Sequence, residues 1–244
     1  MAGLIFESER EISSAFIDSS VKLGIAQAAL LVQDNLTDCF DMLGCDGVRY
    51  LDLNVFWVFT KARFRFAGRP NWRDTISART FPVSNAGFKT NVNTVLSKDG
   101  IPFLFANQEA CVLDKETHRP VRLASLPYPK DGFPGAEFSE PFERFAVPQA
   151  DFSEAFTQPV RSQNIDMSGH MNNNEYIKLA LSAFPDSFLR GREPELLEVH
   201  YTGESTEGQL LRVLKAQQDG AFFVNIAEGG RTVFEMKAAF AAGA

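Results

Sequence analysis

The residues best suited to chemistry lie in one short polar segment in the second half of the chain, from Asn164 to Tyr176. Its members that can exchange protons or hydrogen bonds are Asp166, Ser168, His170, Asn172 and Asn173. A carboxylate, a hydroxyl, an imidazole and an amide at this spacing can activate a water molecule or polarise a carbonyl group. Helix capping and turn formation account for the asparagines, but they do not require an aspartate and a histidine in the same turn. The segment is therefore a candidate site for acid–base chemistry.

A second polar group follows further along the chain. Strand alternation places Glu198 and His200 on one face. Glu204 and Ser205 come at the end of this strand, where a bulge at Gly203 can redirect them. The last glycine of a serine-hydrolase G-x-S-x-G motif is missing around Ser205, so we reject a serine nucleophile.

Two stretches of the chain read as degenerate copies of one unit. Adding 148 (166 − 18) maps Ile17-Asp18 onto Ile165-Asp166, and adding 135 (203 − 68) maps Phe66-Ala67-Gly68 onto Tyr201-Thr202-Gly203. Apolar residues at steps of three or four predict a long helix over 21–43 and a second helix over 173–189. Alternating segments predict strands over 56–66, 75–83, 89–96, 103–113, 196–201, 210–217, 222–227 and 232–240.

The two copies differ in their polar residues. Lys22 and Gly24 match His170 and Asn172, while Arg69 and Pro70 match Glu204 and Ser205. Asp18 keeps the aspartate, but the sequence shows no comparable cluster around it. The asymmetry predicts one chemical site and one vestigial twin.

A proline-rich segment separates the copies. Five prolines lie between Leu126 and Ala150, together with two glycines, and this composition is typical of a linker. We therefore expect an N-terminal domain over 1–126, a linker over 127–150 and a C-terminal domain over 151–244.

The composition restricts the possible partners. The net charge of −7 argues against nucleic acid and against an anionic membrane. The three cysteines, without a CxxC spacing, read as buried free thiols of a reducing compartment. No signal peptide or membrane span is visible, so we expect a cytoplasmic protein. The histidines lack the spacing of a metal site.

The polar segment resembles a family motif. Asp166-x-Ser168-x-His170-Met-Asn172-Asn173-x-x-Tyr176 is similar to the D-x-N-x-H-V-N-N-x-x-Y segment of acyl-acyl-carrier-protein (acyl-ACP) thioesterases, and Glu204-Ser205 lies in register with their Glu-Cys pair. In the first half, Trp57 resembles the aromatic residue that begins their first strand, and the turn from Pro70 to Asp74 is also similar. Two positions differ from the family, because Ser168 replaces its asparagine and Ser205 replaces the cysteine of plant members. A thiol nucleophile is therefore unavailable at position 205.

The resemblance implies an α+β fold of two tandem hot-dog domains, each a long helix wrapped by an antiparallel sheet, joined into one continuous sheet. It implies a hydrolase of fatty acid biosynthesis that needs no cofactor and uses an activated water to convert fatty acyl-ACP into free fatty acid and ACP. The residues expected to act in catalysis are Asp166, His170, Glu204, Ser168 and Asn172, and those expected to bind substrate are Asn173, Tyr176, Ser205 and Trp57. The first domain would hold the acyl tunnel.

Several alternatives stay open at this point. Either Glu204 or Asp166 can act as the base, and unpaired N–H groups at the start of the second helix can bind an oxyanion. The carrier can be ACP or coenzyme A, and a non-catalytic acyl-thioester sensor is a rival function. A hot-dog dehydratase is a further rival, disfavoured because His170 and Glu204 lie in one half. For ACP, the basic residues Lys61, Arg63, Arg65, Arg69 and Arg73 are a candidate docking cluster. The sequence does not indicate the acyl chain length or whether the protein is a homodimer.

Overall fold

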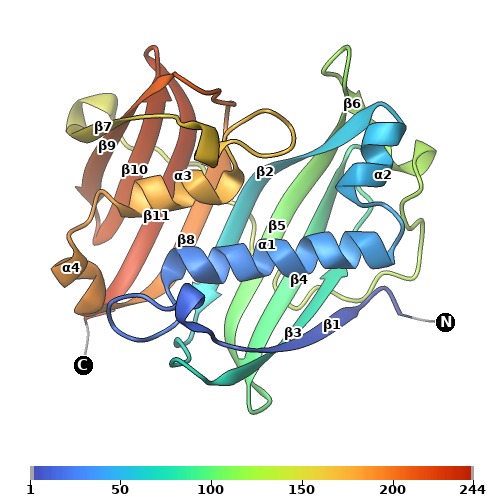
Figure 1. Ribbon diagram of the computed structural model, residues 1–244, viewed down its shortest axis with the longest axis horizontal. Coiled ribbons are helices and arrows are strands. Elements are labelled where there is room, and N and C mark those ends of the chain that lie inside the picture. The colour runs from blue at the N-terminus through green and yellow to red at the C-terminus, as the bar shows by residue number, and fades with distance from the viewer. Residues whose placement is uncertain (1–2, 243–244) are drawn as a thin grey trace. The chain divides into compact units, whose positions relative to one another are not determined.

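A computed structural model describes residues 3–242. These residues fall into two compact units, divided between Pro141 and Phe142. The two units share their main helix and their five longest strands in the same order (Figure 1). Each begins with an edge strand and a short 3₁₀ helix, continues with the main helix and then adds four antiparallel strands. The repeat predicted from the sequence is therefore present in the structure.

The first unit has its sheet in the order β1-β3-β4-β5-β2, with the short β6 beside β5. Its elements are β1 (Phe6–Glu11), η1 (Ser14–Phe16), α1 (Ile25–Met42), α2 (Gly47–Asp52), β2 (Val55–Phe66), β3 (Thr75–Pro82), β4 (Lys89–Lys98), β5 (Ile101–Asp114), β6 (Pro120–Val121) and η2 (Leu123–Ser125). The helix α1 packs on β1, β3 and β4.

The second unit has its sheet in the equivalent order β7-β9-β10-β11-β8. Its elements are η3 (Gln149–Asp151), β7 (Ser153–Pro159), η4 (Ser162–Asn164), α3 (Asn173–Leu181), α4 (Asp186–Arg190), β8 (Arg192–Tyr201), β9 (Leu210–Gln218), β10 (Ala221–Glu228) and β11 (Arg231–Ala242). The helix α3 contacts β10 and β11.

The apolar stripe of the first predicted helix becomes the buried face of α1. Leu31, Val32, Leu36 and Cys39 have no exposed surface, and they follow each other at helical spacing. Gly24 is the N-cap residue, so the helix begins four residues later than its stripe. The fold class predicted from the sequence, α+β with a helix packed on an antiparallel sheet in each of two tandem units, is confirmed.

The second predicted helix, 173–189, is wrong in its length. It ends at Leu181, and the short helix α4 begins after Pro185. Proline has no N–H for an intrahelical hydrogen bond and disfavours helical backbone in the residue before it. Pro185 therefore ends one helix and serves as the N-cap residue of the next.

The sequence analysis missed the two-residue strand β6 and the two longer edge strands, β1 and β7. Each of these edge strands pairs along one side only, β1 with β3 and β7 with β9. Edge strands bury little surface, and their sequences accordingly lack an apolar run. They occupy matching places in the two sheets.

The proline-rich segment is divided between the two units, and each part forms hydrogen bonds with its own unit. Its first part belongs to the first unit, where the N–H groups of Glu137 and Phe138 both donate to Asn93 Oδ1 at 3.0 Å. Its second part belongs to the second unit, where the Glu143 N–H donates to Glu198 Oε1 at 2.8 Å. The boundary between the units falls at Pro141, inside the segment predicted as a linker.

Candidate active site

A tight turn before α3 carries the candidate catalytic residues. The Asp166 N–H donates to the His170 carbonyl at 2.9 Å, and the Gly169 N–H donates to the Asp166 carbonyl at 3.0 Å. Gly169 has a φ of 83°, a left-handed conformation that glycine adopts without steric cost. The Met171 N–H donates to the Ser205 carbonyl at 2.8 Å, which ties the turn to the segment after β8.

His170 and Glu204 meet beside this backbone link. The distance from His170 Nε2 to Glu204 Oε2 is 3.3 Å, and their side chains are 29% and 44% exposed. Because Met171 and Ser205 are bonded, the two residues that precede them are held side by side. A reactant can reach the pair from solvent. The structure thus brings together two residues that the sequence analysis had placed in separate polar groups.

Asp166 and Ser168 lie behind the imidazole of His170. The Ser168 N–H and hydroxyl donate to Asp166 Oδ1 at 2.8 and 2.6 Å. The same hydroxyl lies 3.3 Å from His170 Nδ1. The four side chains therefore form a chain of contacts in the order Asp166, Ser168, His170, Glu204, with the imidazole between two carboxylates.

Asn172 caps the amino end of α3. Its Oδ1 accepts from the Asn174 N–H at 2.9 Å, and its carbonyl accepts from the Glu175 N–H at 3.0 Å. These two N–H groups already have partners, so the expectation of unpaired donors there is wrong for both. Asn173, the first helical residue, offers its carbonyl to the Tyr201 hydroxyl at 3.4 Å.

Tyr176 and Ser205 lie beneath Glu204. Their side chains are buried, with 2% and 0% of the residue exposed. Burial raises the pKa of the Tyr176 hydroxyl, and its contact with Ser205 only partly offsets this effect. Neither side chain is open to solvent in this structure, and their predicted role in substrate binding stays a prediction.

Arg231 is a neighbour of the site that the sequence analysis missed. Its Nη2 lies 3.3 Å from the place that a β-carbon at Gly203 would take, so the guanidinium covers the residue before Glu204. The Gly229-Gly230 turn marks the start of β11 at Arg231, and β11 pairs with the strand that leads to Gly203. This turn was the sequence signal that could have placed Arg231 near the site.

The first unit contains the same turn with other side chains. The Asp18 N–H donates to the Lys22 carbonyl at 2.9 Å, and the Leu23 N–H donates to the Pro70 carbonyl at 2.8 Å. Asp18 also accepts from the Ser20 hydroxyl and forms an ion pair with Arg69, the residue that matches Glu204. The expectation that no polar cluster surrounds Asp18 is therefore wrong.

Electrostatics differ accordingly in the first unit. Burial opposes ionisation of the Asp18 carboxyl, but the Ser20 hydrogen bonds and the Arg69 guanidinium together outweigh it and hold the pKa of Asp18 below its usual value. The Arg69 side chain is 1% exposed. Because Asp18 is paired with a buried guanidinium, the Asp18–Arg69 ion pair has a structural role.

Trp57 lies in the first unit within an aromatic cluster. Its ring stacks on Phe40 and Tyr50 at centroid distances of 4.5 and 5.2 Å, and its Nε1 donates to the Cys45 carbonyl at 2.7 Å. The surrounding side chains are apolar and buried, including Tyr128. Its predicted role in substrate binding stays a prediction.

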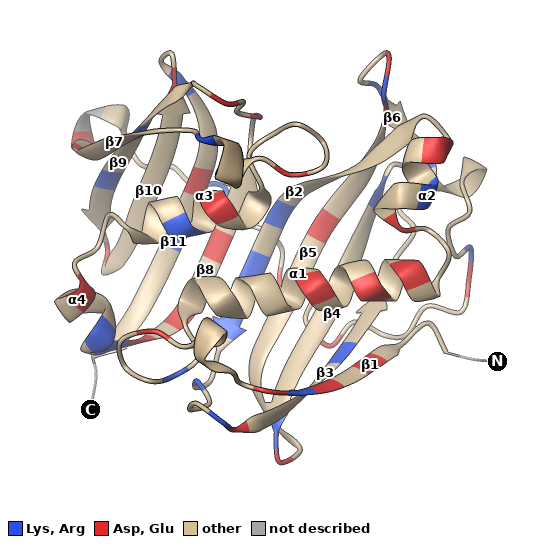
Figure 2. Cartoon of the chain, viewed as in Figure 1, with Lys and Arg blue, Asp and Glu red and all other residues tan. Residues whose placement is uncertain are grey.

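The five basic residues predicted as a docking cluster do not form one open surface. Arg63 is 3% exposed and binds Glu140 at 3.2 Å, Arg65 also pairs with Glu140, and Arg69 is buried against Asp18. Lys61, Arg63 and Arg65 share one face of β2, whereas Arg69 and Arg73 follow the end of the strand. Figure 2 shows in addition that α1 is charged only by acidic residues.

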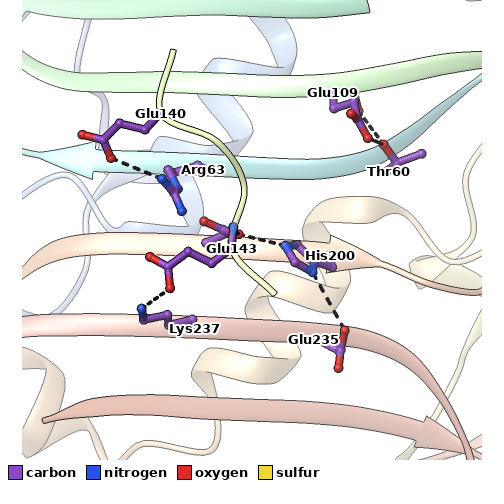
Figure 3. A network of polar contacts seen from close by, with 9 residues as sticks. Thr60, Arg63, Glu109, Glu140, Glu143, His200, Glu235 and Lys237 are labelled. Atoms are coloured by element: carbon purple, nitrogen blue, oxygen red, sulfur yellow. Dashed lines mark hydrogen bonds and ion pairs between the residues drawn. The ribbon is translucent and has the colours of Figure 1, made fainter. Parts of the chain in front are cut away.

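The second polar group, Glu198 and His200, holds the linker against the sheet of the second unit. His200 Nε2 lies 2.9 Å from Glu198 Oε1, and the Phe145 ring stacks on the imidazole at 4.3 Å. Figure 3 shows His200 directed toward Glu235 and Lys237 bound to Glu143. Both Glu198 and His200 are buried, so this group is separate from the exposed His170–Glu204 pair.

The three cysteines are free and buried, as predicted. Burial raises the pKa of the Cys39 and Cys45 thiols to about 12 and also raises that of Cys111. These thiols are therefore protonated at neutral pH and unsuited to nucleophilic attack. Within 3–242, no helix has the length and apolar character needed to cross a membrane.

Comparison with solved structures defines the class of fold. An acyl-ACP thioesterase from Bacteroides thetaiotaomicron superposes with a TM-score of 0.85 at 18% identity, covering 98% of each chain. A 12:0-ACP thioesterase from Umbellularia californica superposes with a TM-score of 0.82 at 14% identity, covering 99% of each chain. The chain therefore has the double hot-dog fold along almost its whole length. A search of the curated proteins finds no match.

The family model described as the acyl-ACP thioesterase C-terminal domain matches residues 148–239. The second unit of the chain therefore matches this family model, and the whole chain has the same fold as the two thioesterases above. The matched region contains the whole chain of contacts from Asp166 to Glu204.

Proposed function

We propose that this protein is a thioesterase that hydrolyses fatty acyl-ACP to a free fatty acid and ACP. The observation that carries the proposal is the His170–Glu204 pair, at 3.3 Å and open to solvent. It occurs in the unit that matches the acyl-ACP thioesterase family model, whereas Lys22 and Arg69 take the same places in the other unit.

Glu204 is the proposed base. Asp166 Oδ1 already accepts two hydrogen bonds from Ser168, in the same turn that Asp18 forms in the first unit, so its role is to hold the turn. Glu204 has no such counterpart in the twin, where an arginine replaces it. Between the two carboxylates left open by the sequence, the geometry supports Glu204.

The proposed reaction is a direct attack by water. Glu204 accepts a proton as the water oxygen bonds to the thioester carbon, and the carbonyl oxygen becomes an oxyanion. When the carbon–sulfur bond breaks, the thiolate takes a proton from the imidazolium of His170. The products are a carboxylic acid and a thiol. The proton held by Glu204 then passes to the neutral His170, which restores the starting carboxylate and imidazolium.

Ser168 and Asp166 are proposed to orient the imidazole. The Ser168 hydroxyl lies between Asp166 Oδ1 at 2.6 Å and His170 Nδ1 at 3.3 Å. A partner on Nδ1 fixes the ring so that Nε2 faces Glu204. The negative charge of Asp166, on the far side of Ser168, stabilises the imidazolium of His170 that donates the proton.

ACP is the proposed acyl donor on the strength of the family model that the second unit matches and of the two structural relatives named for this carrier. Hydrolysis of acyl-ACP from C8 to C18, measured beside acyl-CoA of the same chain lengths, tests this choice. A kcat/KM at least tenfold higher for one or more acyl-ACP substrates is expected. Turnover of acyl-CoA alone would show that coenzyme A, and not ACP, is the carrier. Tight binding of acyl thioesters without turnover would support a sensing function in place of hydrolysis.

A further inference from the structure

The second unit has a cavity between α3 and the edge strand β7, with a volume of about 270 Å³. Its floor is apolar and consists of Phe156, Val160, Met171, Leu179 and Leu211. Its rim is polar and contains Gln158, Asn164, Glu175, Lys178 and Ser182. An engineered apolar cavity of about 150 Å³ is large enough to bind benzene, so this one has room for a small ligand.

The equivalent space in the first unit is bridged by side chains. Arg10 pairs with Ile76 across the sheet as Gln158 pairs with Leu211, so Arg10 and Gln158 occupy the same place. Arg10 reaches over the Phe16 ring at 5.9 Å and toward Asp34 Oδ2 at 3.8 Å. The guanidinium thus links β1 to α1 across the space.

The three residues of that bridge are all changed in the second unit. Adding 148 (158 − 10) maps Arg10 onto Gln158, Phe16 onto Asn164 and Asp34 onto Ser182. All three replacements are smaller, and none carries a charge. The local backbone also differs, because β7 has a bulge between Glu154 and Phe156 and α3 ends at Leu181, just before Ser182. The smaller side chains therefore open the cavity together with these backbone differences.

The charges at the rim favour an anion. Both oxygens of Glu175 have donors, since Oε2 accepts from Asn164 at 2.9 Å and Oε1 from Lys178 at 2.6 Å. The Lys178 ammonium has three donors, and its side chain is 47% exposed at the rim. Because only one of these donors is used by Glu175, a negatively charged head group can accept from the others.

From this arrangement we infer that the α3–β7 cavity is a binding site for a medium-chain aliphatic monocarboxylate. The hydrocarbon chain lies on the floor from Phe156 to Met171, and the carboxylate binds Lys178. Such an acid is also the product of the proposed hydrolysis, but the binding site does not rest on that activity, because it uses none of His170, Glu204 or Ser168.

Calorimetric titration of the full chain with octanoate and decanoate tests the inference. Saturable binding of one equivalent at this site is expected in the parent. The double variant Gln158→Arg with Ser182→Asp rebuilds the bridge of the first unit and should weaken decanoate binding at least tenfold. Unchanged affinity in the folded double variant would place the ligand elsewhere and overturn the inference, as would the absence of saturable binding in the parent.

Methyl NMR of ¹³C-labelled methionine gives a second readout that does not depend on the double variant. Met171 lines the cavity, whereas Met42 lies in α1 of the other unit. Decanoate should shift the Met171 methyl signal, assigned with Met171→Leu, and leave that of Met42 in place. Lys178→Gln should weaken the binding of decanoate about fivefold and leave the binding of 1-decanol unchanged. Equal losses of affinity for both ligands would show that Lys178 does not bind the carboxylate.

Discussion

The turns before α1 and α3 have matching backbone hydrogen bonds, but they carry side chains of different chemistry. In both, an aspartate accepts from a serine two residues later, and the residue after the turn donates its N–H to the chain beyond a strand of the sheet. In the first unit the turn ends in the buried Asp18–Arg69 ion pair, and in the second unit in the exposed His170–Glu204 pair. One scaffold thus supports a structural bond in one copy and proton-transfer groups in the other.

This comparison separates the residues that build the turn from those that can act on a substrate. Asp166 and Ser168 have counterparts in Asp18 and Ser20, so their presence alone indicates a turn. His170 and Glu204 have none. The sequence analysis noted that Asp18 keeps the aspartate, but it missed the matching serine, Ser20.

The largest effect is expected when the second site is converted to its twin. The double variant His170→Lys with Glu204→Arg should place the introduced guanidinium beside Asp166, as Arg69 lies beside Asp18, and keep the unit folded. Thioester hydrolysis should fall by about 10³-fold or more, because both proton-transfer groups are lost. Steady-state hydrolysis and circular dichroism measure the two outcomes, and an active double variant would contradict the assignment of the site.

A loss of stability is expected when the ion pair of the first unit is broken. Asp18→Asn leaves a buried guanidinium without its carboxylate, which should cost about 2–3 kcal/mol in the free energy of unfolding. Asp166→Asn, its match in the exposed turn, should cost less than about 1 kcal/mol. Urea denaturation of both variants measures the difference, and equal costs would show that the two turns do not differ in this way.

The pH dependence of stability follows from the same pair. The pKa of Asp18 lies below its usual value of 3.8 in the folded protein, so the folded state binds fewer protons than the unfolded state around that pH. The stabilisation is present above the unfolded pKa and is lost as the pH falls through the folded pKa. Stability curves between pH 2 and pH 6 should therefore be flatter for Asp18→Asn than for the parent.

A smaller effect is expected from the two matched serines. Ser168→Ala removes the contact to His170 Nδ1 and should lower kcat by roughly tenfold at unchanged KM. Ser20→Ala has no imidazole to affect and should alter stability only. A kcat for Ser168→Ala equal to that of the parent would remove Ser168 from the proposed orienting chain.

The smallest effect concerns backbone conformation. Val21 has a φ of 61° where its counterpart Gly169 has 83°, and a β-branched residue is strained in this region. Val21→Gly should therefore stabilise the protein by about 0.5–1 kcal/mol, since relief of strain exceeds the added entropy of the unfolded chain. Thermal unfolding checks the sign, and a loss of stability would show that the Val21 side chain contributes more than its strain costs.

Much of the fold could be predicted from the sequence because its elements repeat and their apolar periods are clear. The stripe that ends at Leu43 marked α1, and the matched positions of Asp18 and Asp166 located the two turns. The edge strands β1 and β7 were missed because they have one partner each and no apolar run. Pro185 was the overlooked signal for the break between α3 and α4.

The sequence could predict which residues lie in the candidate site, but not which of their side chains are buried. Nothing local in the sequence indicates that Tyr176 and Ser205 lie below the surface or that Arg63 and Arg69 are buried against carboxylates. Arg69 and Asp18 are 51 residues apart, and such contacts depend on how strands align. The α3–β7 cavity likewise depends on Gln158, Asn164 and Ser182, which are separated in the sequence and come together only in the folded unit.

The central claim is that one of the two equivalent turns carries the chemistry. Hydrolysis of acyl-ACP by the parent, measured beside His170→Ala, Glu204→Ala and the matched Lys22→Ala, tests it most directly. The account predicts that both substitutions in the second unit lower kcat/KM by about 10²-fold or more in folded protein, while Lys22→Ala stays within about twofold of the parent. Turnover that survives His170→Ala and Glu204→Ala would contradict the account.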